Sequence, residues 1–473
     1  MNSIFNSTPA ESLHKKSKKI FDYIHGLITI DTFFFKFIDT PQFQRLRDLY
    51  QLTTSNFVFP TANHTRFEHS LGTFSLSNKY ITFLKQNQPE LDISQSLINT
   101  VSLCGLCHNI GYSPYSNSFV SFCKENLNVN FDYHDMSAKI INQIIENEGI
   151  EPETQNEPEQ FDLKELIKMV SHKEKSSHYY EQIANNTLNG IDADIFDYIR
   201  RDIYKYGFPQ QSFDYQILMN NAYVINDDIC YRSQDAYSVY DLFMSKFIMS
   251  KKFYLHRAAK ATELMIKDIF ALANPYFHFE EKIQNVDSFM ELNDNIIGQI
   301  YHSKSPLLSE ARNIVNGIYH RDLYAFAGEY DSSSLKSSFE TFNEETLLKY
   351  TSSNEVKLTR NDIRIAKLKL NLGIDENDPI TNVWFYDSEY NKVRVDRNEI
   401  SHLLPNKFQE RIIRVYITSK DEKKISSAQQ ALINFCKENG TAPSLYKSAK
   451  KVQKTYEHNF DENFLKKSLN LFN

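Results

Sequence analysis

Apolar side chains recur every three to four positions along much of this 473-residue chain, most regularly over residues 97–110 and 255–272. That spacing places the apolar side chains along one face of a helix, which can then bury them in a core. Glycine, with 12 residues, and proline, with 13, seldom interrupt the pattern. The pattern therefore predicts a mainly α fold.

A different pattern appears toward the C-terminus. Apolar and polar residues alternate over residues 383–400 and 410–420, which is typical of strands with one buried face. We expect these strands to belong to a smaller α+β lobe. Two stretches rich in polar and turn-forming residues interrupt the periodic segments: residues 151–160 predict a surface loop, and residues 330–345 predict a mobile connection.

Composition narrows the class of protein. Hydrophobic residues make up 41% of the chain, the net charge is -7 and the isoelectric point is near 6.1. This charge gives no bulk attraction to nucleic acid or anionic membranes, and the basic segments 15–19 and 447–454 are more typical of solvated surface. The first 19 residues lack an uninterrupted apolar core, and no run of 18 apolar residues follows. We therefore predict a soluble intracellular protein, nuclear or cytoplasmic, without a membrane partner.

Five cysteines are spread along the chain, an odd number that fits a reducing compartment better than a disulfide framework. Cys104 and Cys107 form a C-x-x-C inside an apolar helical run. Two small buried side chains are the favoured interpretation, because no second such pair accompanies them. A zinc or redox role is the alternative.

Three separate segments place nitrogen and oxygen ligands beside predicted helices: HTRFEHSLG at 64–72, GLCHNIGYSPYSNSF at 105–119 and NGIDADIFDYIRRD at 189–202. Two imidazoles and two carboxylates around a divalent cation form a common hydrolytic site, because the cation neutralises phosphate oxygens and acidifies a bound water. His69, His108 and Asp194 would supply three such ligands. Asn109 would be a weaker fourth, since its amide oxygen is neutral. Taken singly, each histidine is more often a hydrogen-bonded core residue.

The third segment also predicts a helix with two different faces. Polar side chains follow Asp194 at Tyr198, Arg201 and Asp202, while an apolar stripe is formed by Ile191, Ile195 and Ile199. One face would pack in the core, and the other would present polar groups to a site.

These segments resemble the HD-domain deoxynucleoside triphosphate triphosphohydrolases of the sterile-alpha-motif and HD-domain-containing family. The likeness runs from about Lys18 to beyond Arg414 through IHG (24–26), IDTPQFQRLR (38–47), VFP (58–60), RFEHSLG (66–72), GLCH (105–108), NGID (189–192), FDY (213–215), LLP (403–405) and IRVY (413–416). It implies an HD-domain helical phosphohydrolase core over residues 18–326, a C-terminal α+β regulatory and oligomerisation lobe over 327–473, and an N-terminal tail over 1–17. Because fewer than 20 residues precede the likeness, we expect no sterile alpha motif domain.

The resemblance implies roles for individual side chains. In the metal site, His69, His108 and Asp194 match the family's ligands, while Asn109 stands where the family has Asp. The matches to substrate contacts are Gln51 and Asp202 for the sugar 3'-hydroxyl, Arg66 for phosphate, and Tyr198 and Tyr254 for the sugar and base.

The catalytic positions depart from the family. Tyr112 and Asn117 stand where the family has histidines for phosphate contact and proton transfer, and Val120 stands where it has Asp. His134 matches a further active-site histidine, whose expected carboxylate partner is the one missing at Val120. A positioned acid or base contributes about 10² to 10⁴ in rate, and neither tyrosine nor asparagine replaces a titrating imidazole near neutral pH. The resemblance therefore implies severely reduced triphosphohydrolase activity.

The family also assembles in response to activator nucleotides. Asp39, Gln44 and Arg47 match the residues that recognise guanine, although Gln44 and Arg47 also fit a solvated polar helix face. His256 and Arg257 match part of a second activator site, whose other cationic positions are here Ile217 and Gln234. GTP or dNTP is the expected activator ligand, and a dimer is expected in preference to a nucleotide-linked tetramer.

The leading hypothesis is a catalytically impaired, nucleotide-binding family member that acts as a regulatory or structural subunit, either as a homodimer or as a hetero-oligomer with a paralogue. It would bind dNTP or GTP, and more weakly a divalent metal such as Mg, Mn, Fe or Zn. The alternative is an active metal-dependent triphosphohydrolase that converts dNTP to deoxynucleoside and triphosphate, with Asn109 as a neutral ligand and His134 or a metal-bound water transferring the proton. A nucleic-acid-binding module is the least favoured hypothesis.

Overall fold

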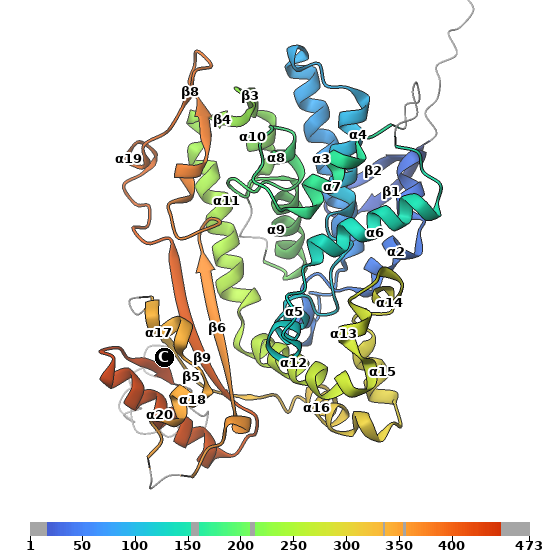
Figure 1. Cartoon of the computed structure of the whole chain (residues 1–473). Helices are drawn as coiled ribbons and strands as arrows, with labels where there is room; N and C mark the ends of the chain where they lie inside the picture. Colours follow the sequence, from blue (N-terminus) through green and yellow to red (C-terminus); the bar gives the residue numbers. More distant parts are fainter. Residues whose placement is uncertain (1–16, 153–159, 209–212, 334–335, 353–355, 446–473) are drawn as a thin grey trace, which may run out of the picture. The chain divides into compact units, whose positions relative to one another are not determined.

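The computed structural model describes residues 17–152, 160–208, 213–333, 336–352 and 356–445 (Figure 1). The described residues fall into two compact units. Unit 1 lies within Met1–Tyr319 and Leu370–Gln409, and unit 2 lies within His320–Lys369 and Glu410–Asn473. Apart from Ser17, the predicted N-terminal tail lies outside the described residues, as do the basic segment 447–454 and most of the predicted loop 151–160. The boundary between residues 326 and 327 stays a prediction.

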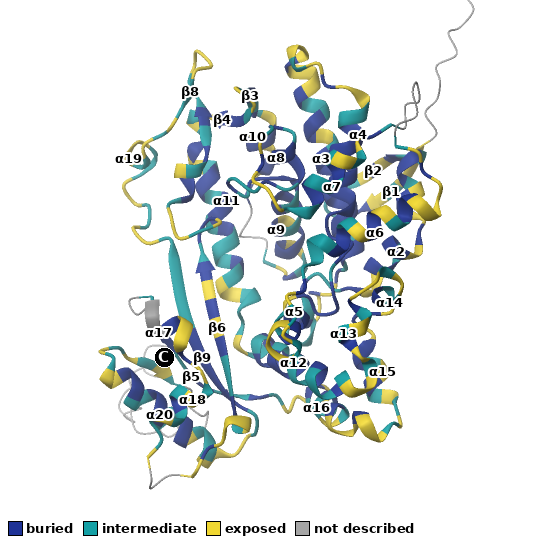
Figure 2. Cartoon of the chain, viewed as in Figure 1, coloured by how far each residue is buried: buried dark blue, intermediate teal, exposed yellow. Residues whose placement is uncertain are grey.

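Three helices form the centre of unit 1: α3 (Arg66–Asn87), α4 (Gln95–Cys107) and α9 (Ala193–Lys205). Most residues of α3 and α9 are buried (Figure 2). Glycine allows α3 to approach both partners closely, because a Cβ on Gly72 would lie 1.9 Å from Asp197 Oδ1 of α9, and a Cβ on Gly105 of α4 would lie 2.4 Å from Ser77 Oγ of α3. This approach brings the first turns of α3 and α9 together.

Side-chain caps fix where these helices begin. Asp192 accepts the N–H of Ile195 at 2.9 Å at the start of α9, and Ser94 accepts the N–H of Leu97 at 3.1 Å at the start of α4. The helix predicted over 97–110 is confirmed as α4, and the predicted isoleucine stripe of α9 is buried. Local sequence therefore accounts for both elements.

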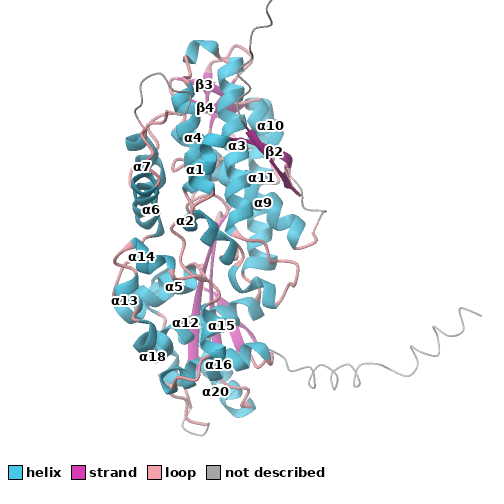
Figure 3. Ribbon diagram, turned by 90° about the vertical axis from the view of Figure 1, so that its right-hand side faces the viewer, coloured by secondary structure: helices cyan, strands magenta, loops and turns pink. Residues whose placement is uncertain are grey.

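Further helices surround this centre, and helix dominates the side view in Figure 3. The helix predicted over 255–272 is confirmed as α12 (Arg257–Phe277), which packs against α16 and α5. The mainly α prediction is therefore confirmed. The other helices of unit 1 are α1 (Phe35–Ile38), α2 (Pro41–Gln44), α5 (Asn117–Phe122), α6 (Tyr133–Asn147), α7 (Leu163–Ser171), α8 (Glu181–Ala184), α10 (Tyr215–Asn220), α11 (Ala236–Met249), α13 (Phe279–Lys282), α14 (Val286–Met290), α15 (Ile296–His302), α16 (Ser309–Tyr319) and α19 (Arg397–Ile400).

Unit 1 also contains two small sheets. The strands β1 (Ser17–Asp22) and β2 (Gly26–Asp31) form an antiparallel hairpin. A second sheet has the order β3-β4-β7-β8, built from β3 (Tyr223–Ile225), β4 (Asp228–Arg232), β7 (Trp384–Tyr386) and β8 (Lys392–Val393). Of the stretch 383–400 predicted as strand, β7 and β8 are strands, whereas its end forms the helix α19. Moreover, β7 pairs in parallel with β4 and does not join the strands of unit 2. Alternation identifies a strand without selecting its partner.

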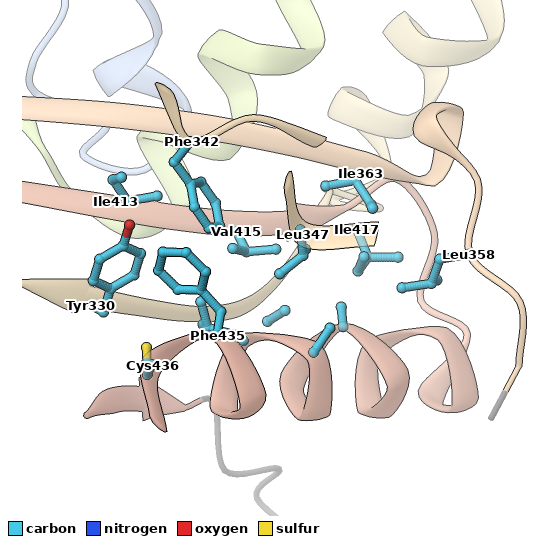
Figure 4. Close-up of a cluster of buried hydrophobic side chains, with 14 of the residues drawn as sticks. Tyr330, Phe342, Leu347, Leu358, Ile363, Ile413, Val415, Ile417, Phe435 and Cys436 are labelled. Carbon is cyan, nitrogen blue, oxygen red and sulfur yellow. The ribbon is translucent and has the colours of Figure 1, made fainter. Parts of the chain in front are cut away.

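Unit 2 contains the smaller α+β lobe that the sequence predicts. Its sheet has the order β10-β5-β9-β6, formed mainly by unit 2 residues of β5 (Ala325–Asp331), β6 (Ile363–Asn371), β9 (Gln409–Ile417) and β10 (Pro443–Leu445). The helix α20 (Glu422–Glu438) lies along the strands, and the buried side chains Phe342, Val415 and Phe435 fill the space between them (Figure 4). Part of the connection predicted over 330–345 is helical, in α17 (Lys336–Thr341) and the start of α18 (Glu344–Leu348).

The cysteines behave as apolar core residues. All five are free and buried, which confirms the favoured interpretation of Cys104 and Cys107. Burial raises the pKa of both thiols, so they stay protonated and unreactive near neutral pH. No helix among the described residues is both long enough and apolar enough to cross a membrane.

Candidate functional site

His69, His108 and Asp194 converge at one point in unit 1. His69 lies in the first turn of α3, His108 directly follows α4, and Asp194 lies in the first turn of α9. The Nε2 atoms of both histidines lie 2.9 Å from Asp194 Oδ1, and the three candidate ligand atoms lie within 4.8 Å of one another. We call these three residues the His-His-Asp cluster.

Asp197 supports this cluster from inside the core. Its Oδ2 accepts the Nδ1–H of His69 at 2.7 Å, and its carboxylate accepts two hydrogen bonds from Arg201 at 2.8 and 2.9 Å. Arg201 also donates to Asp22 at 2.8 Å, and His25 Nε2 lies 2.6 Å from Asp197 Oδ1. Asp197 and Arg201 are fully buried. This network holds the His69 ring with Nε2 directed at the cluster.

The sequence pattern did not single out Asp197, Asp22 or His25. Asp197 and Arg201 are four positions apart on α9, a spacing that favours an ion pair and could have been noticed. Asp22 and His25 lie 179 and 172 residues away from their partners, beyond the reach of any local pattern. Arg201, which was predicted to face the site, is turned instead toward the two buried carboxylates that neutralise it.

The close charges within the cluster shift its pKa values. Burial lowers the pKa of His69, but hydrogen bonds to Asp194 and Asp197 outweigh burial and raise that pKa to about 9. Burial raises the pKa of Asp194, but hydrogen bonds from His108 and His69 outweigh it and hold that pKa well below its ordinary value. Without a metal, the carboxylate is therefore ionised and His69 is protonated near neutral pH. A bound cation would replace that proton.

The donor set fits a divalent cation. Two imidazole nitrogens and one carboxylate oxygen are ligands that first-row divalent metals accept. The Nδ1–H of His108 donates to Gly105 O at 3.1 Å, which leaves Nε2 of His108 available to a cation. In the same way, the Nδ1–H of His69 donates to Asp197, which leaves Nε2 of His69 available. Asn109 Nδ2 lies 2.7 Å from His108 Nε2, and a half-turn of the amide would bring a neutral oxygen ligand to that place.

A cavity of about 330 Å³ lies beside the cluster in unit 1. His69, Asn109 and Asp194 contribute to its lining. The residues inferred as substrate contacts line the same cavity: Gln51, Arg66, Tyr198, Asp202 and Tyr254. The volume is at the lower end of the range of roughly 300 to 1,000 Å³ found for small-molecule sites.

Several polar atoms at the cavity have no hydrogen-bond partner in the protein. Tyr254 OH donates to Asp202 Oδ2 at 2.6 Å, and His64 Nε2 lies 3.0 Å from Asp202 Oδ1 without forming an aligned hydrogen bond. Gln51 Oε1 and Arg66 Nε are buried and have no hydrogen-bond partner in the protein, and Asp202 Oδ1 has only the unaligned contact with His64. Each such atom costs about 1–3 kcal/mol if it stays unpaired. The cavity is therefore suited to water or to a ligand with several hydrogen-bonding groups.

Comparison with known proteins identifies the family, although no protein-family model matches the chain. The chain is 35% identical to the deoxynucleoside triphosphate triphosphohydrolase SAMHD1 homolog of Dictyostelium discoideum over 449 residues, which cover 94% of this chain and 85% of that protein. It is 31% identical to SAMHD1 of Homo sapiens, covering 89% of this chain and 73% of that protein. The chain belongs to the SAMHD1 family of HD-domain deoxynucleoside triphosphate triphosphohydrolases. An HD domain-containing protein of Acanthamoeba polyphaga mimivirus is 28% identical over 87% of this chain and 94% of that protein.

Where the SAMHD1 family pattern implies catalytic histidines, this chain forms an aromatic stack. The guanidinium carbon of Arg66 lies 3.3 Å from the centre of the Tyr112 ring. Tyr112 in turn stacks on Tyr133, with 4.0 Å between ring centres, and Tyr133 lies 4.0 Å from the ring of His134. We call these four residues the Arg66 stack. Asn117 also lines the cavity, whereas Val120 is not among its described lining residues.

His134 ends this stack and is not among the described residues that line the cavity. Its Nδ1–H donates to Val170 O at 3.2 Å, so a backbone carbonyl takes the place of the carboxylate that the SAMHD1 family pattern implies. Burial, together with the nearby His172, lowers the pKa of His134 to about 4. The imidazole is therefore neutral near pH 7 and has no acidic proton ready for a leaving group.

The residues matched to the first SAMHD1 activator site lie at the surface of unit 1. Asp39 pairs with Lys18 at 3.1 Å, and both side chains are more than half exposed. Arg47 donates to Gln44 Oε1 at 2.7 Å, and its guanidinium lies 3.6 Å from the centre of the Phe67 ring. These contacts also fit a solvated polar face, so nucleotide binding here stays a prediction.

The residues matched to the second activator site stand at the start of α12. His256 Nδ1 accepts the N–H of Ala258 at 3.3 Å and so caps the helix, and Arg257 is the first helical residue. Capping alone accounts for a polar side chain at His256. A nucleotide-binding role for His256 and Arg257 also stays a prediction.

Proposed function

We propose that this chain binds deoxynucleotides beside the His-His-Asp cluster, hydrolyses dNTPs poorly, and acts as a regulatory or structural subunit. One observation carries the proposal: a single cavity joins the cluster to Gln51, Arg66 and Asp202, each of which has a buried polar atom that forms no hydrogen bond within the protein. Such a lining suits a ligand with hydroxyl and phosphate groups. Membership of the SAMHD1 family supports a nucleotide as that ligand.

The proposed roles follow the two sides of the cavity. The sugar would lie against Tyr198 and Tyr254, with its 3'-hydroxyl meeting Gln51 and Asp202. Arg66 would meet a phosphate oxygen. His69, His108 and Asp194 would hold a divalent metal, with Asn109 as a weaker ligand. When bound, such a metal supplies charge neutralisation and an acidified water.

The proposed impairment rests on the groups that surround the phosphate side. The Tyr112 phenol covers Arg66 where the family pattern implies an imidazole, and His134 is neutral and bonded to a backbone carbonyl. Loss of one positioned acid or base costs about 10² to 10⁴ in rate. Such losses overlap when the groups act together, so they do not simply multiply.

A second candidate function is an active triphosphohydrolase with an altered metal site. The observation that favours it is the intact geometry of the His-His-Asp cluster and the buried support that Asp197 gives to His69. Asn109 would act as a neutral ligand. Proton transfer would then fall to a metal-bound water or to His134.

Turnover measurements separate the two candidates. Purified protein is incubated with each dNTP, with Mg²⁺ or Mn²⁺, and with or without GTP, and released triphosphate and deoxynucleoside are quantified. We expect a kcat/KM at least about 100-fold below that of an active family member assayed in parallel. Turnover within a few-fold of that enzyme would overturn the proposed impairment and favour the second candidate.

Binding and assembly are measured separately. A dNTP that binds the folded state should raise the thermal unfolding midpoint, and GTP should do so if the activator positions are functional. Light scattering with and without nucleotide tests the proposed homodimer, and mixing with an active paralogue tests a hetero-oligomer. The absence of stabilisation by any nucleotide would leave only a structural role. An intracellular location, nuclear or cytoplasmic, is part of the same proposal.

A further inference from the structure

We propose that the cavity prefers a deoxynucleoside or deoxynucleoside monophosphate over a triphosphate. This inference rests on the proposed nucleotide-binding function and specifies the length of the phosphate chain. Two independent observations lead to it: the charge balance of the cavity lining and the position of Tyr112 against Arg66.

The fixed charges of the lining nearly cancel. Among the described residues that line the cavity, Arg66 and Lys260 are the permanently charged cations and Asp194, Asp202 and Glu263 are anionic. His69 also lines the cavity, but both of its ring nitrogens are bonded to carboxylates, Asp194 and Asp197. Lys260 forms an ion pair with Glu263, so it is already neutralised. Arg66 is then the one lining arginine or lysine that is not paired with a carboxylate of the lining. A bound divalent cation would leave only a small positive excess.

One further cation lies near the cluster. Lys246 is largely buried, interacts electrostatically with Asp192 and Asp194, and has a pKa lowered by burial. It does not belong to the described cavity lining. Arg201 is nearby as well, but Asp197 and Asp22 neutralise it. Both side chains therefore already face carboxylates of the core, Asp192 and Asp194 for Lys246 and Asp197 and Asp22 for Arg201.

Arg66 itself is only partly available. One of its terminal nitrogens donates to Ser116 Oγ at 2.8 Å, and the Tyr112 ring covers one face of its guanidinium at 3.3 Å. The Tyr112 ring is held by the stacked ring of Tyr133. The part of the Arg66 guanidinium that stays available includes its buried Nε, which has no hydrogen-bond partner. This small donor surface suits one phosphate group better than a chain of three phosphates.

Electrostatics then separate the candidate ligands. A single phosphate carries about 1.5 to 2 negative charges near neutral pH, which Arg66 and one divalent cation can balance. Each added phosphate brings further negative charge, but among the described lining residues Arg66 is the one arginine or lysine that is not paired with a carboxylate. An unmatched charge in a partly buried site is strongly unfavourable. The nucleoside part is not penalised, because Gln51, Asp202 and Tyr254 offer neutral or acceptor groups to its hydroxyls.

Calorimetric titration tests this preference on the unmodified full chain. Deoxyadenosine, dAMP, dADP and dATP, and the matching guanine series, are titrated in Mg²⁺, in Mn²⁺ and in a chelator, and chromatography confirms that each ligand remains intact. We expect the nucleoside or monophosphate to bind at least about tenfold more tightly than the triphosphate. If the triphosphate binds most tightly, this inference is overturned while the proposed nucleotide binding stands. If no compound binds, both fail.

A variant tests the part assigned to Tyr112. Tyr112→Ala uncovers the guanidinium of Arg66 and enlarges the phosphate side, so the ratio of triphosphate to monophosphate affinity should rise about tenfold. The matched control is Tyr390→Ala, which removes an exposed tyrosine stacked on Tyr386 at 5.2 Å between ring centres, away from the cavity. If folded Tyr112→Ala keeps the same ratio of triphosphate to monophosphate affinity, Tyr112 does not cause the preference for a short phosphate chain.

Discussion

The two sides of the His-His-Asp cluster are held by different kinds of interaction. On the α9 side, Asp197 joins His69 to Arg201, and Arg201 to Asp22, through buried charged hydrogen bonds. On the opposite side, the chain after His108 leads to Tyr112, which is held mainly by ring contacts to Arg66 and Tyr133. Ligand geometry is thus fixed by a charge network within the helical core. Aromatic packing stands where the family resemblance predicts groups that move protons.

On the proposed function, this contrast means that the cluster geometry and the proton-transfer groups are held by separate sets of contacts. The ligands depend on the crossing of α3 and α9, where even one added carbon at Gly72 would collide with Asp197. The proposed phosphate side depends on side chains in the segment that follows α4, such as Tyr112, which contacts Arg66 and Tyr133 through its ring. The proposed impairment is therefore compatible with an intact His-His-Asp cluster, and each side can be tested separately.

The largest expected effect comes from breaking the charge network. Asp197→Asn leaves Arg201 and His69 without their buried carboxylate, and we expect a loss of about 3–5 kcal/mol in the free energy of unfolding. Urea denaturation followed by circular dichroism measures it. The control is Asp39→Asn, whose pair with Lys18 is exposed and should cost less than about 1 kcal/mol. Equal effects of the two substitutions would contradict the distinction between the two sides.

Substitutions on the opposite side, in the segment after His108, should increase dNTP hydrolysis. The combined variant Asn109→Asp, Tyr112→His and Asn117→His restores the family's ligand and two imidazoles, and kcat/KM for dNTPs should rise by on the order of 10² to 10⁴. Release of triphosphate measures the gain. Adding Asp194→Asn to this variant removes a ligand and should abolish it. No gain in a folded variant would show that the deficit lies elsewhere in the cavity.

Metal binding should depend on the cluster and not on the Arg66 stack. At a free Mn²⁺ concentration 100-fold above its Kd, the free energy of unfolding should rise by about 2.7 kcal/mol, which is measured as a higher thermal unfolding midpoint. His69→Ala should lose this gain. His134→Ala removes a histidine outside the described cavity lining and should retain it. Retention in both variants would place the metal at another site.

The smallest expected effect is a pH dependence from His134. Its pKa falls from 6.5 to about 4 on folding, so its contribution to stability is fully present above pH 6.5 and is lost as the pH falls toward 4. We expect a loss of about 1–2 kcal/mol across this window, after allowance for partial exposure. When the free energy of unfolding is measured against pH in the presence of a chelator, His134→Gln should flatten the curve between pH 6.5 and 4. An identical slope in both proteins would mean that other groups cause it.

Most residues of the candidate site could be predicted from the family resemblance. The ligand segments and the five inferred substrate contacts lie in short motifs, and the structure places those five residues around one cavity. The roles of the ligand residues, the substrate contacts, Asn109, His134 and the activator residues remain predictions. The i, i+4 pair of Asp197 and Arg201 could also have been noticed, because its signal is local.

The sequence by itself determined the elements whose signals are local: the periodic helices α4 and α12, the buried isoleucine stripe at α9, and the two short strands β7 and β8 within residues 383–400. The tertiary structure alone decided which distant partners these elements meet. It joined Asp22 and His25 to the α9 network, paired β7 with β4, and set Tyr112 between Arg66 and Tyr133. The physical reason is that periodicity and capping act within a few residues, whereas ion pairs, strand partners and ring stacks depend on which surfaces the folded core brings together.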